Sequence, residues 1–502
     1  MKRIIFSAAS ILFVSGFLLL FLTSSFPTSQ PSVASAQTSV LHWPMAGHDV
    51  ERTSRADEAP HTVAKNPRWF KRIHDFRPGE GHYIPAEAHL VTYPGEGSRP
   101  GLIFVPTSGG LYALKEDGSL FWFYKTDMPV GHSPTIVNDV AYVSVFDKTI
   151  HAVNIDNGQK IWQTDTAGAG FDTSPIVVNN TVYAGNRDGY FYAFDAGDNG
   201  AMKWSFKTGG RISYSAAYKN NVLYFASNDS HAYAVNATTG QQIWKSAKLP
   251  GDGFYSYWPV IITDKVIFPG TSPYRNLIDI YFINDQVLPA NDKPMGVDPD
   301  SNGWYDAALV QIYLAANPQR RNVFVLNQSN GQEVTPYAPI LHKGANSALR
   351  YPPVVTSNNT LIFNAPHTNV GDLWLKGNAM AWKLGTSLVK PAGGGDSNDE
   401  IDAHAVIGSY LYSIHHSDQG GGVYNISNLE SQTTPFSNQI TELLAYKLRE
   451  YFPNYYEGWD KRKYGAGPKT LGTGNFGYAN PPVPLGNNVY FHRSNAIVSF
   501  GP

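Results

Sequence analysis

The stretch AVNATTGQQIW, residues 234–244, decides the fold because it returns along the chain. A matching stretch, AVNIDNGQKIW, occupies residues 152–162. Tryptophans recur at intervals of 40, 42 and 40 residues, at Trp122, Trp162, Trp204 and Trp244. Short apolar runs separated by turns, repeated with this period, predict one four-stranded sheet per repeat, as in the blades of a β-propeller.

Each repeat carries residues that suit such a sheet. A turn residue and a glycine follow the third predicted strand at Asn154 and Gly158, Asp195 and Gly200, and Asn236 and Gly240. Asn and Asp side chains initiate turns, and glycine supplies the left-handed conformation that such turns often need. A small alanine on the third strand and a large tryptophan on the fourth fit the taper of stacked blades. We therefore assign the four tryptophans a packing role.

Weaker copies of the repeat extend the propeller to residues 66–502. We predict an all-β, eight-bladed β-propeller, with seven blades as the alternative if the degenerate unit at 404–426 is not a blade. The last unit, residues 482–500, has only three strands, whereas residues 66–71 resemble a fourth strand without a blade. Pairing these N- and C-terminal strands in one blade would close the ring and leave no unpaired edge. Two partly helical insertions are expected, at about 271–321 and 429–477.

Composition excludes several classes of protein. Aromatic residues make up 13% and charged residues 16% of the chain, which contradicts the composition of disordered chains and of coiled coils. Lys and Arg number 38 against 40 Asp and Glu, so a protein that mainly neutralises nucleic-acid phosphates is not expected. The absence of cysteine excludes disulfides, thiolate metal sites and cysteine nucleophiles.

The N-terminus has the features of an export signal. Lys2 and Arg3 precede an apolar run at residues 4–22, and Ala34-Ser35-Ala36 offers a cleavage site. These features predict a signal peptide at 1–36, followed by an N-terminal extension at 37–65. The run is also long enough to span a bilayer, so an uncleaved anchor is the alternative and the only membrane contact expected. In either case the propeller is extracytoplasmic: secreted, periplasmic or at the cell surface, most simply of a bacterium.

The repeat stretches quoted above resemble those of the pyrroloquinoline quinone (PQQ) family of propellers. The segment WPMAGHD at residues 43–49 also resembles the start of many bacterial PQQ-like repeat proteins. The resemblance implies the quinoprotein alcohol dehydrogenase-like superfamily. That superfamily contains dehydrogenases and also non-enzymatic propellers, such as the lipoprotein scaffold of outer-membrane protein assembly, so the fold does not decide the function.

For a dehydrogenase, the resemblance implies PQQ at the mouth of the central channel, with Ca²⁺ as Lewis acid, an acidic base and an aromatic floor. The chain has no recognisable arrangement of these ligands, so its catalytic and cofactor-binding residues stay unassigned. The loops that lead into the innermost strands are expected to place at the mouth Glu87, His89, His132, Asp172, Arg211, Tyr257, Trp258, Arg350, Asp402, His404 and Tyr478. Loops between second and third strands are expected to add Arg187, Asp188, His415, His416, Asp418 and Arg493.

The first insertion contains a candidate calcium loop. Its oxygen ligands alternate as in calcium-binding loops, with Gly303 at the sixth position for the sharp turn. The predicted ligands are Asp298, Asp300, Asn302, the backbone carbonyl of Trp304, and Asp306. Leu309 stands where an EF-hand has Glu, which predicts a weaker site or one completed elsewhere. An Asp/Asn/Gly-rich surface turn is the alternative. The following residues, 307–316, are expected to form a short helix.

The second insertion offers a candidate partner site. Residues 441–452 have apolar side chains at helical spacing and predict an amphipathic helix. Beyond it, aromatic and basic residues alternate at Tyr455, Tyr456, Trp459, Lys461, Arg462, Lys463 and Tyr464. Such a patch suits a glycan, a polyanion or a partner protein, although a loop packed by its own aromatics is an equal alternative. Residues 393–402 are expected to form an acidic flexible loop.

Two functions follow from these features. The sequence favours an exported binding or scaffold propeller that holds a protein or glycan through its mouth or the 429–477 insertion, with a structural Ca²⁺. The alternative is a PQQ-dependent quinoprotein dehydrogenase that oxidises alcohols or sugars at the channel mouth. Whether the protein is an enzyme is left open by the residues.

Overall fold

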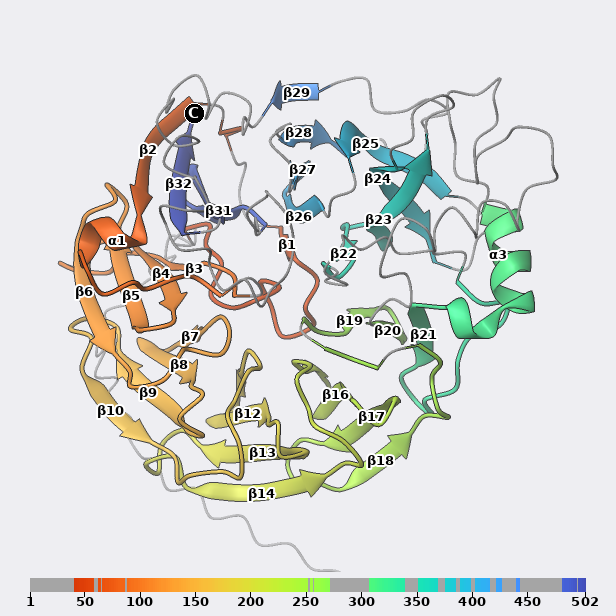
Figure 1. The fold of residues 1–502 in the computed structure, drawn as a ribbon, viewed down its shortest axis with the longest axis horizontal. Coiled ribbons are helices and arrows are strands. Elements are labelled where there is room, and N and C mark those ends of the chain that lie inside the picture. The colour runs from red at the N-terminus through yellow and green to blue at the C-terminus, as the bar shows by residue number, and fades with distance from the viewer. Residues whose placement is uncertain are drawn as a thin grey trace, which may run out of the picture. The chain divides into compact units, whose positions relative to one another are not determined.

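The fold is an eight-bladed β-propeller within the unit Ser39–Pro502 (Figure 1). The structure is a computed structural model. It describes residues 40–57, 62–64, 66–85, 88–251, 253–255, 257–270, 307–338, 351–368, 375–384, 389–398, 402–415, 421–426, 439–442, 481–493 and 495–502. The eight sheets confirm the predicted fold class. They also show that the propeller has eight blades and not the alternative of seven. The predicted signal peptide lies outside the described residues.

Blades 1 to 4 each contain four antiparallel strands in chain order from the axis outward. Blade 1 comprises β3 (Val91–Tyr93), β4 (Leu102–Thr107), β5 (Gly110–Lys115) and β6 (Leu120–Lys125). Blade 2 comprises β7 (Thr135–Val137), β8 (Val140–Ser144), β9 (Ile150–Asn154) and β10 (Lys160–Gln163). Blade 3 comprises β11 (Ile176–Val178), β12 (Thr181–Gly185), β13 (Tyr190–Asp195) and β14 (Met202–Lys207). Blade 4 comprises β15 (Ala217–Lys219), β16 (Val222–Ser227), β17 (His231–Asn236) and β18 (Gln242–Lys245).

Blades 5 to 8 are less regular. Blade 5 comprises β19 (Val260–Ile262), β20 (Lys265–Pro269) and β21 (Val323–Asn327). Blade 6 comprises β22 (Val354–Val355), β23 (Thr360–Thr368), β24 (Leu375–Lys383) and β25 (Val389–Asn398). Blade 7 comprises β26 (Asp402–Ile407), β27 (Tyr410–His415), β28 (Gly421–Asn425) and β29 (Gln439–Glu442), with β1 (Arg55–Ala56) parallel to β26. Blade 8 comprises β30 (Val483–Leu485), β31 (Asn488–Arg493), β32 (Ala496–Gly501) and β2 (Asn66–Arg72).

The two ends of the propeller close the ring in blade 8, as the sequence predicted. Strand β2 pairs antiparallel with β32, with Trp69 opposite Ser499 and Phe70 opposite Val498. The N-terminal strand thus supplies the outer strand that the last unit lacks. Because the closing pair runs along a whole strand, no edge of β32 is left for pairing with another chain.

Each outer-strand tryptophan joins its blade to the next. The indole N–H of Trp122 donates to the Ile155 carbonyl at 2.7 Å, and that of Trp69 donates to the Glu116 carbonyl at 2.8 Å. The same bond runs from Trp162 to Ala196, from Trp204 to Ala237 and from Trp244 to Gln328. These contacts confirm that the tryptophans fill the space between neighbouring sheets. Apolar side chains of adjacent blades complete the core between them.

Residues 40–56 form a strap that circles the axis and contacts every blade (Figure 1). Its backbone carbonyls accept hydrogen bonds from amides of the innermost strands and, in blade 8, from the residue that follows the innermost strand. The pairs are Leu41 with Gly486, Trp43 with Thr92, Pro44 with Ile136, Val50 with Tyr218, Glu51 with Ile261, Thr53 with Val355, and Ser54 with Val406. Blade 3 is reached through the Arg52 side chain, which donates to the Ser174 carbonyl at 3.2 Å. The strap therefore holds the innermost strands of all eight blades together.

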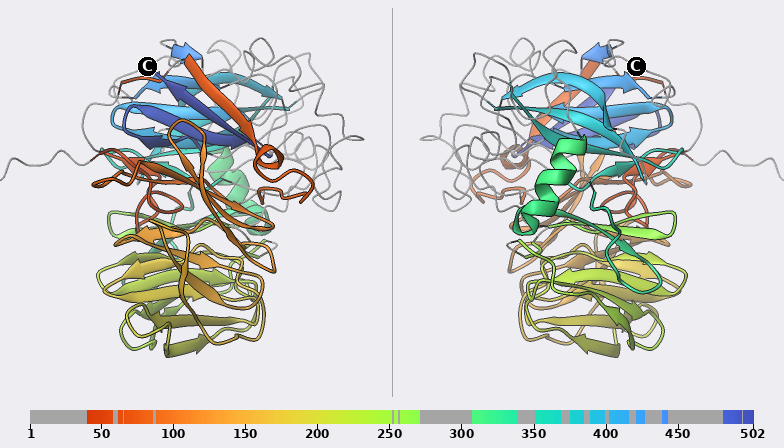
Figure 2. Two further views of the ribbon diagram at one scale, coloured as in Figure 1. Left: turned by 90° about the vertical axis from the view of Figure 1, so that its left-hand side faces the viewer. Right: turned by 90° about the vertical axis from the view of Figure 1, so that its right-hand side faces the viewer.

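The insertions agree with the sequence predictions only in part. Helix α3 (Ala307–Ala316) occurs where a helix was predicted and lies on the outer side of the ring (Figure 2). It is followed by a short 3₁₀ helix, η1 (Pro318–Arg320), and a further short helix, α1 (Ile73–Phe76), follows β2. The predicted helix at 441–452 is wrong for Thr441 and Glu442, which belong to β29 and pair with β28. Residues 443–452 lie outside the described residues. An acidic loop at 393–402 is also wrong for residues 393–398, which belong to β25.

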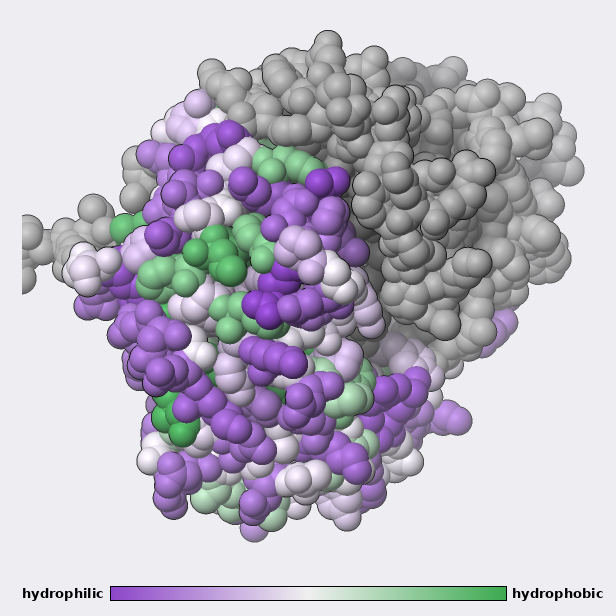
Figure 3. Space-filling view, turned by 60° about the vertical axis from the view of Figure 1, so that its left-hand side comes forward, coloured by the Kyte–Doolittle hydropathy of each residue, from purple (hydrophilic) through white to green (hydrophobic). Residues whose placement is uncertain are grey.

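None of the helices in the described part of the chain has the length and apolarity needed to cross a bilayer. On the side shown in Figure 3, hydrophilic residues cover most of the described surface and hydrophobic residues form small groups among them.

Candidate functional site at the mouth of the propeller

The mouth is the end of the ring where loops lead into the innermost strands. His89, His132, Asp172, Arg211 and Trp258 lie just before β3, β7, β11, β15 and β19, as predicted. Asp402 and His404 instead belong to strand β26 itself. Glu87, Arg350, His416, Asp418 and Tyr478 lie outside the described residues.

Five side chains from blades 1, 2, 5 and 6 form an axial cluster, defined here as His89, His132, Tyr257, Trp258 and Tyr351. The rings of His89 and Trp258 lie 4.9 Å apart, and those of Tyr257 and Tyr351 lie 5.2 Å apart. His132 contacts Trp258 at 6.0 Å between ring centroids. All five are at most 4% exposed, so aromatic and imidazole rings fill the axis at this level.

The ring nitrogens of the axial cluster are incompletely hydrogen-bonded. The Ser133 amide donates to His132 Nδ1 at 2.8 Å, so the neutral imidazole carries its hydrogen on Nε2. Within the described part of the chain, His132 Nε2, His89 Nε2 and Trp258 Nε1 are buried without a hydrogen-bond partner. Each such group costs about 1–3 kcal/mol. These are the polar groups that a ligand or bound water on the axis would satisfy.

Burial holds both histidines of the axial cluster in the neutral form. It lowers the pKa of His132 to about 3, and Arg52 lowers it further by charge repulsion. It also lowers the pKa of His89 well below its ordinary value, with His132 adding to the effect. An efficient general base has a pKa near the working pH. The cluster is therefore suited to hydrogen bonding and packing and poorly suited to proton transfer at neutral pH.

Arg52 of the strap lies against the axial cluster. Its side chain is hydrogen-bonded to the strap and to the loops that lead into blades 3 and 4. Its guanidinium lies 5.5 Å from the centre of the Trp258 ring, a cation–π contact. Arg52 Nε donates to the Ala216 carbonyl at 2.9 Å, and its terminal nitrogens donate to the carbonyls of Ala46 and Ser174. Burial lowers the pKa of Arg52 to about 9, although the nearby Asp49 carboxylate acts in the opposite direction and raises it. Arg52 still carries its charge at neutral pH and closes the axis on the side of the strap.

The exposed groups of the mouth lie on its rim, over blades 3 to 5. Asp172 Oδ2 lies 3.3 Å from Arg187 Nε, and its side chain is 16% exposed. Burial raises the pKa of Asp172 to about 6, and the opposing attraction of Arg187 does not offset this. The Arg211 guanidinium lies 4.8 Å from the centre of the Tyr255 ring, which is 38% exposed. The rim thus combines charged groups with an accessible aromatic ring.

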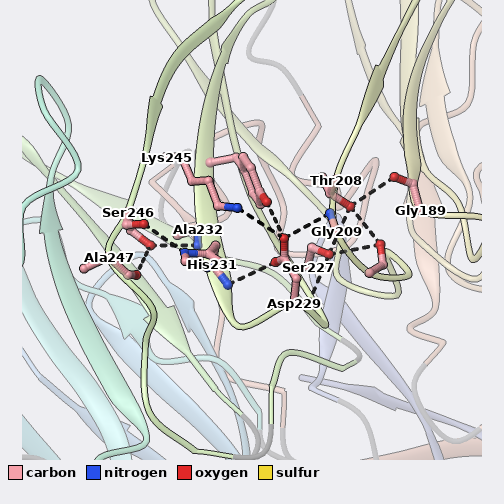
Figure 4. Close-up of polar contacts among 12 residues, drawn as sticks. Gly189, Thr208, Gly209, Ser227, Asp229, His231, Ala232, Lys245, Ser246 and Ala247 are labelled. Carbon is pink, nitrogen blue, oxygen red and sulfur yellow. Dashed lines mark hydrogen bonds and ion pairs between the residues drawn. The ribbon is translucent and has the colours of Figure 1, made fainter.

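Aspartates fix the rim loops between second and third strands. Asp229 accepts a hydrogen bond from the Gly209 amide at 3.0 Å and from the Tyr233 hydroxyl, and its carboxylate lies 3.7 Å from Lys245 Nζ (Figure 4). One repeat earlier, Asp188 accepts from the Gly168 amide and the Tyr192 hydroxyl. These carboxylates are occupied by structural bonds, so they hold the loops and are unavailable to a ligand.

The predicted calcium ligands Asp298, Asp300, Asn302, Trp304 and Asp306 lie outside the described residues. In the described part of the chain, no three His, Asp or Glu side chains come together in a way that could hold a metal ion. The calcium loop stays a prediction from the sequence.

Sequence reasoning missed the strap and the two tyrosines Tyr255 and Tyr351. The WPMAGHD segment was recognised as a family feature, but nothing in its pattern placed it across the axis. Tyr351 stands directly before Pro352-Pro353, as His132 and Ser133 stand before Pro134. Aligning the residues in front of these prolines would have found it.

The eight-bladed fold and the repeat are similar to those of PQQ-like β-propellers. Residues 85–198 and 147–264 match the family model described as outer membrane protein assembly factor BamB. No curated protein matches the chain. A quinohemoprotein alcohol dehydrogenase from Comamonas testosteroni is 11% identical, with a TM-score of 0.57 over 92% of this chain and 80% of that one. The quinohemoprotein alcohol dehydrogenase ADHIIG from Pseudomonas putida HK5 is 13% identical, with a TM-score of 0.54 and the same coverage. At these identities the likeness shows the fold alone.

The described residues do not fit PQQ with Ca²⁺. PQQ carries several carboxylates and a quinone, and in a dehydrogenase it needs a metal cage and a base beside it. On the axis the described groups are two neutral histidines and three aromatic rings, all buried. Asp172 on the rim is the acid with a suitably raised pKa, and it is engaged by Arg187.

Proposed function

We propose that this protein is an exported propeller that binds another molecule at the rim of its mouth and has no oxidoreductase activity. The observation that carries the proposal is the contrast between the axis and the rim. Buried rings and Arg52 occupy the axis, whereas Arg187, Arg211 and Tyr255 are exposed. Asp188 and Asp229 fix the loops that carry Arg187 and Arg211. Rigid loops that carry charged and aromatic groups are suited to recognition.

The family description supports a binding role. The matching family model is described as an outer membrane protein assembly factor. The matched residues, 85–264, include blades 1 to 4 and therefore much of the rim described above. A protein or glycan partner held there, or at the 429–477 insertion, is consistent with this role.

A reconstitution experiment tests the proposal against a dehydrogenase. The purified protein is incubated with PQQ and Ca²⁺ and assayed for dye reduction with a series of alcohols and aldose sugars. We expect no PQQ-dependent reduction, while a quinohemoprotein alcohol dehydrogenase treated in parallel reduces the dye. PQQ-dependent reduction by this protein would overturn the proposal in favour of the quinoprotein dehydrogenase alternative.

The extracytoplasmic location is part of the proposal and rests on the N-terminal sequence. Lys2, Arg3, the apolar run and the Ala34-Ser35-Ala36 site predict export and cleavage after Ala36. Mass spectrometry of the protein from its native cells checks this. We expect the mature chain to begin at Gln37, and an intact N-terminus would support the anchor alternative.

A structural Ca²⁺ in the first insertion is the other part of the proposal. Isothermal titration with CaCl₂ should give binding heat that disappears in a variant with Asp298→Ala and Asp300→Ala. The matched control, Asp198→Ala with Asp264→Ala, removes two carboxylates from exposed turns of blades 3 and 5 and should retain the heat. Absence of heat in the unmodified protein would refute the calcium site.

A further inference from the structure

Three exposed cations lie on neighbouring segments of the rim. We define them as the basic rim cluster: Arg187, Lys207 and Arg211. The Ile212 amide donates to the Asn186 carbonyl at 3.0 Å, so the β12–β13 and β14–β15 loops lie side by side. Lys207, at the end of β14, joins them because its Nζ donates to the Asp188 carbonyl at 2.6 Å. The cluster is therefore one surface built by blades 3 and 4.

Each cation of the basic rim cluster lies over an aromatic ring. The pairs are Arg187 with Phe146 at 5.5 Å, Lys207 with Tyr190 at 4.1 Å, and Arg211 with Tyr255 at 4.8 Å, measured from the charged group to the ring centre. A cation–π contact holds a cation in place and leaves its charge unneutralised. Within the described part of the chain, neither Lys207 nor Arg211 has a carboxylate at ion-pair distance. Both charges therefore stay available to a partner.

The carboxylates of this part of the rim lie deeper than the cations. The side chain of Arg187 is 40% exposed, whereas that of Asp172, its ion-pair partner, is 16% exposed. The side chain of Asp229 is 12% exposed and accepts a hydrogen bond from the Gly209 amide. A partner that approaches the mouth therefore meets positive charge first, and complementary charge favours an anionic partner.

The size and composition of the basic rim cluster indicate which anion it suits. Proteins that bind nucleic acids or other long polyanions present a large basic surface, whereas this cluster has three cations and the whole chain has a net charge of −2. Tyr255 is 38% exposed beside Arg211. Arginine and tyrosine dominate the binding energy of protein interfaces. The cluster therefore favours a few carboxylates on another protein.

Asp172 lies where it can regulate this surface. Its Oδ2 lies 3.3 Å from Arg187 Nε, the charges that face it are those of Arg187 and Arg211, and the Ser213 hydroxyl also bonds to it. Burial raises the pKa of Asp172 to about 6. Above this pH the ionised carboxylate offsets part of the charge of both guanidiniums. Below it the ion pair is lost, and the full charge of the arginines faces the solvent.

We infer that the basic rim cluster holds an acidic segment of a partner protein, and that Asp172 competes with this segment for Arg187. Exposed Asp and Glu side chains of a partner have an ordinary pKa near 4, so they are still charged at pH 5.5, where Asp172 is mostly protonated. Binding should therefore tighten as the pH falls from 7.5 to 5.5. This inference rests on the proposed binding role of the mouth and names the partner's chemistry and its regulation.

Fluorescence anisotropy with a labelled peptide of alternating Asp and Ser tests the inference on the full-length protein without added PQQ. A peptide of alternating Asn and Ser is the neutral control. The titrations are run at low ionic strength, because salt screens interactions between exposed charges. We expect saturable binding of the acidic peptide alone, about three- to fivefold tighter at pH 5.5 than at pH 7.5.

Variants assign the binding and its pH dependence to these residues. Lys207→Gln and Arg211→Gln should each weaken binding of the acidic peptide by about three- to fivefold. Lys160→Gln, which removes an exposed cation from the outer strand of blade 2, is the matched control and should bind like the unmodified protein. Asp172→Asn should bind at pH 7.5 as tightly as the unmodified protein binds at pH 5.5, and its affinity should be the same at both pH values.

Three outcomes would overturn the inference. The first is no saturable binding of the acidic peptide at either pH, or equal binding of the neutral peptide. The second is a pH dependence that Asp172→Asn leaves unchanged, although thermal melts show this variant folded. The third is tighter binding of a sulfated heparin tetrasaccharide than of the acidic peptide. Because the titration omits PQQ, its result is independent of the dye-reduction assay, and the failure of either proposal can be told from the failure of the other.

Discussion

The indole of Trp204 covers Gly240 of the next blade, and its N–H donates to the Ala237 carbonyl at 3.0 Å. Gly240 has a φ of +72°, and a Cβ built on it would lie 2.7 Å from Trp204 Cδ2. The same arrangement joins Trp122 to Gly158 and Trp162 to Gly200. The glycine is therefore required twice, once for the left-handed turn and once for the close approach of the indole.

Gly240→Ala should destabilise the propeller by both routes. The left-handed conformation and the crowding of Trp204 together cost about 2–4 kcal/mol. Urea unfolding followed by tryptophan fluorescence measures this. Gly97→Ala is the matched control, because Gly97 has a φ of +58° but a Cβ added to it would meet no atom within 4 Å; it should cost only about 1–2 kcal/mol. Equal losses in the two variants would show that the contact with Trp204 contributes nothing.

The blade pattern could be predicted from the sequence because the same pair of packing residues recurs from repeat to repeat. A tryptophan at one blade's outer edge requires a glycine in the next blade's turn, so the two recur together. The pairing of Trp69 with Ser499 was predictable because residues 66–71 resemble an outer strand without a sheet. In these cases local pattern and global fold agree.

The strap and β29 could not be predicted in the same way. Residues 40–56 have no repeat and no alternation, and their path is fixed by hydrogen bonds to residues as distant as Gly486. Thr441 and Glu442, the first two residues of the predicted helix, pair with β28 and complete blade 7. For these two residues, pairing with a neighbouring strand decides the conformation. Tyr255 joined the candidate site only when the structure placed it beside Arg211.

Arg52→Lys should loosen the strap. Lysine keeps the buried charge but lacks the planar fork that reaches the carbonyls of Ala216 and Ser174. Loss of these bonds costs about 2–4 kcal/mol of unfolding free energy. Hydrogen exchange should also become faster at the amides of Tyr218 and Ile261, which donate to the strap. Arg55→Lys, at a partly exposed arginine of the same segment, is the control. Unchanged exchange at both amides would contradict a holding role for Arg52.

Acid should destabilise the propeller through His132. The unfolded imidazole takes up a proton below its ordinary pKa of 6.5, whereas in the folded protein the pKa is about 3. The unfolded state thus binds more protons, and stability falls as the pH drops from about 6.5 towards 3, by roughly 1.4 kcal/mol per pH unit. His132→Asn keeps an acceptor for the Ser133 amide and should reduce the slope between pH 6 and 4 by that amount. An identical slope in the variant would mean that His132 is protonated in the folded state.

Asp172→Asn should stabilise the protein at neutral pH. The folded pKa of about 6 lies above the ordinary 3.8, so the unfolded carboxyl loses its proton first, and stability falls as the pH rises from about 4 to 6. The cost persists above pH 6 and reaches roughly 1–3 kcal/mol, allowing for residual solvent contact. Unfolding at pH 7.5 should therefore require more urea in Asp172→Asn, while at pH 4 the two proteins should unfold alike. A buried charge retained at this cost is typical of a functional residue. If Asp172→Asn is instead less stable at both pH values, the pair with Arg187 is a net stabilising contact and Asp172 has a structural role.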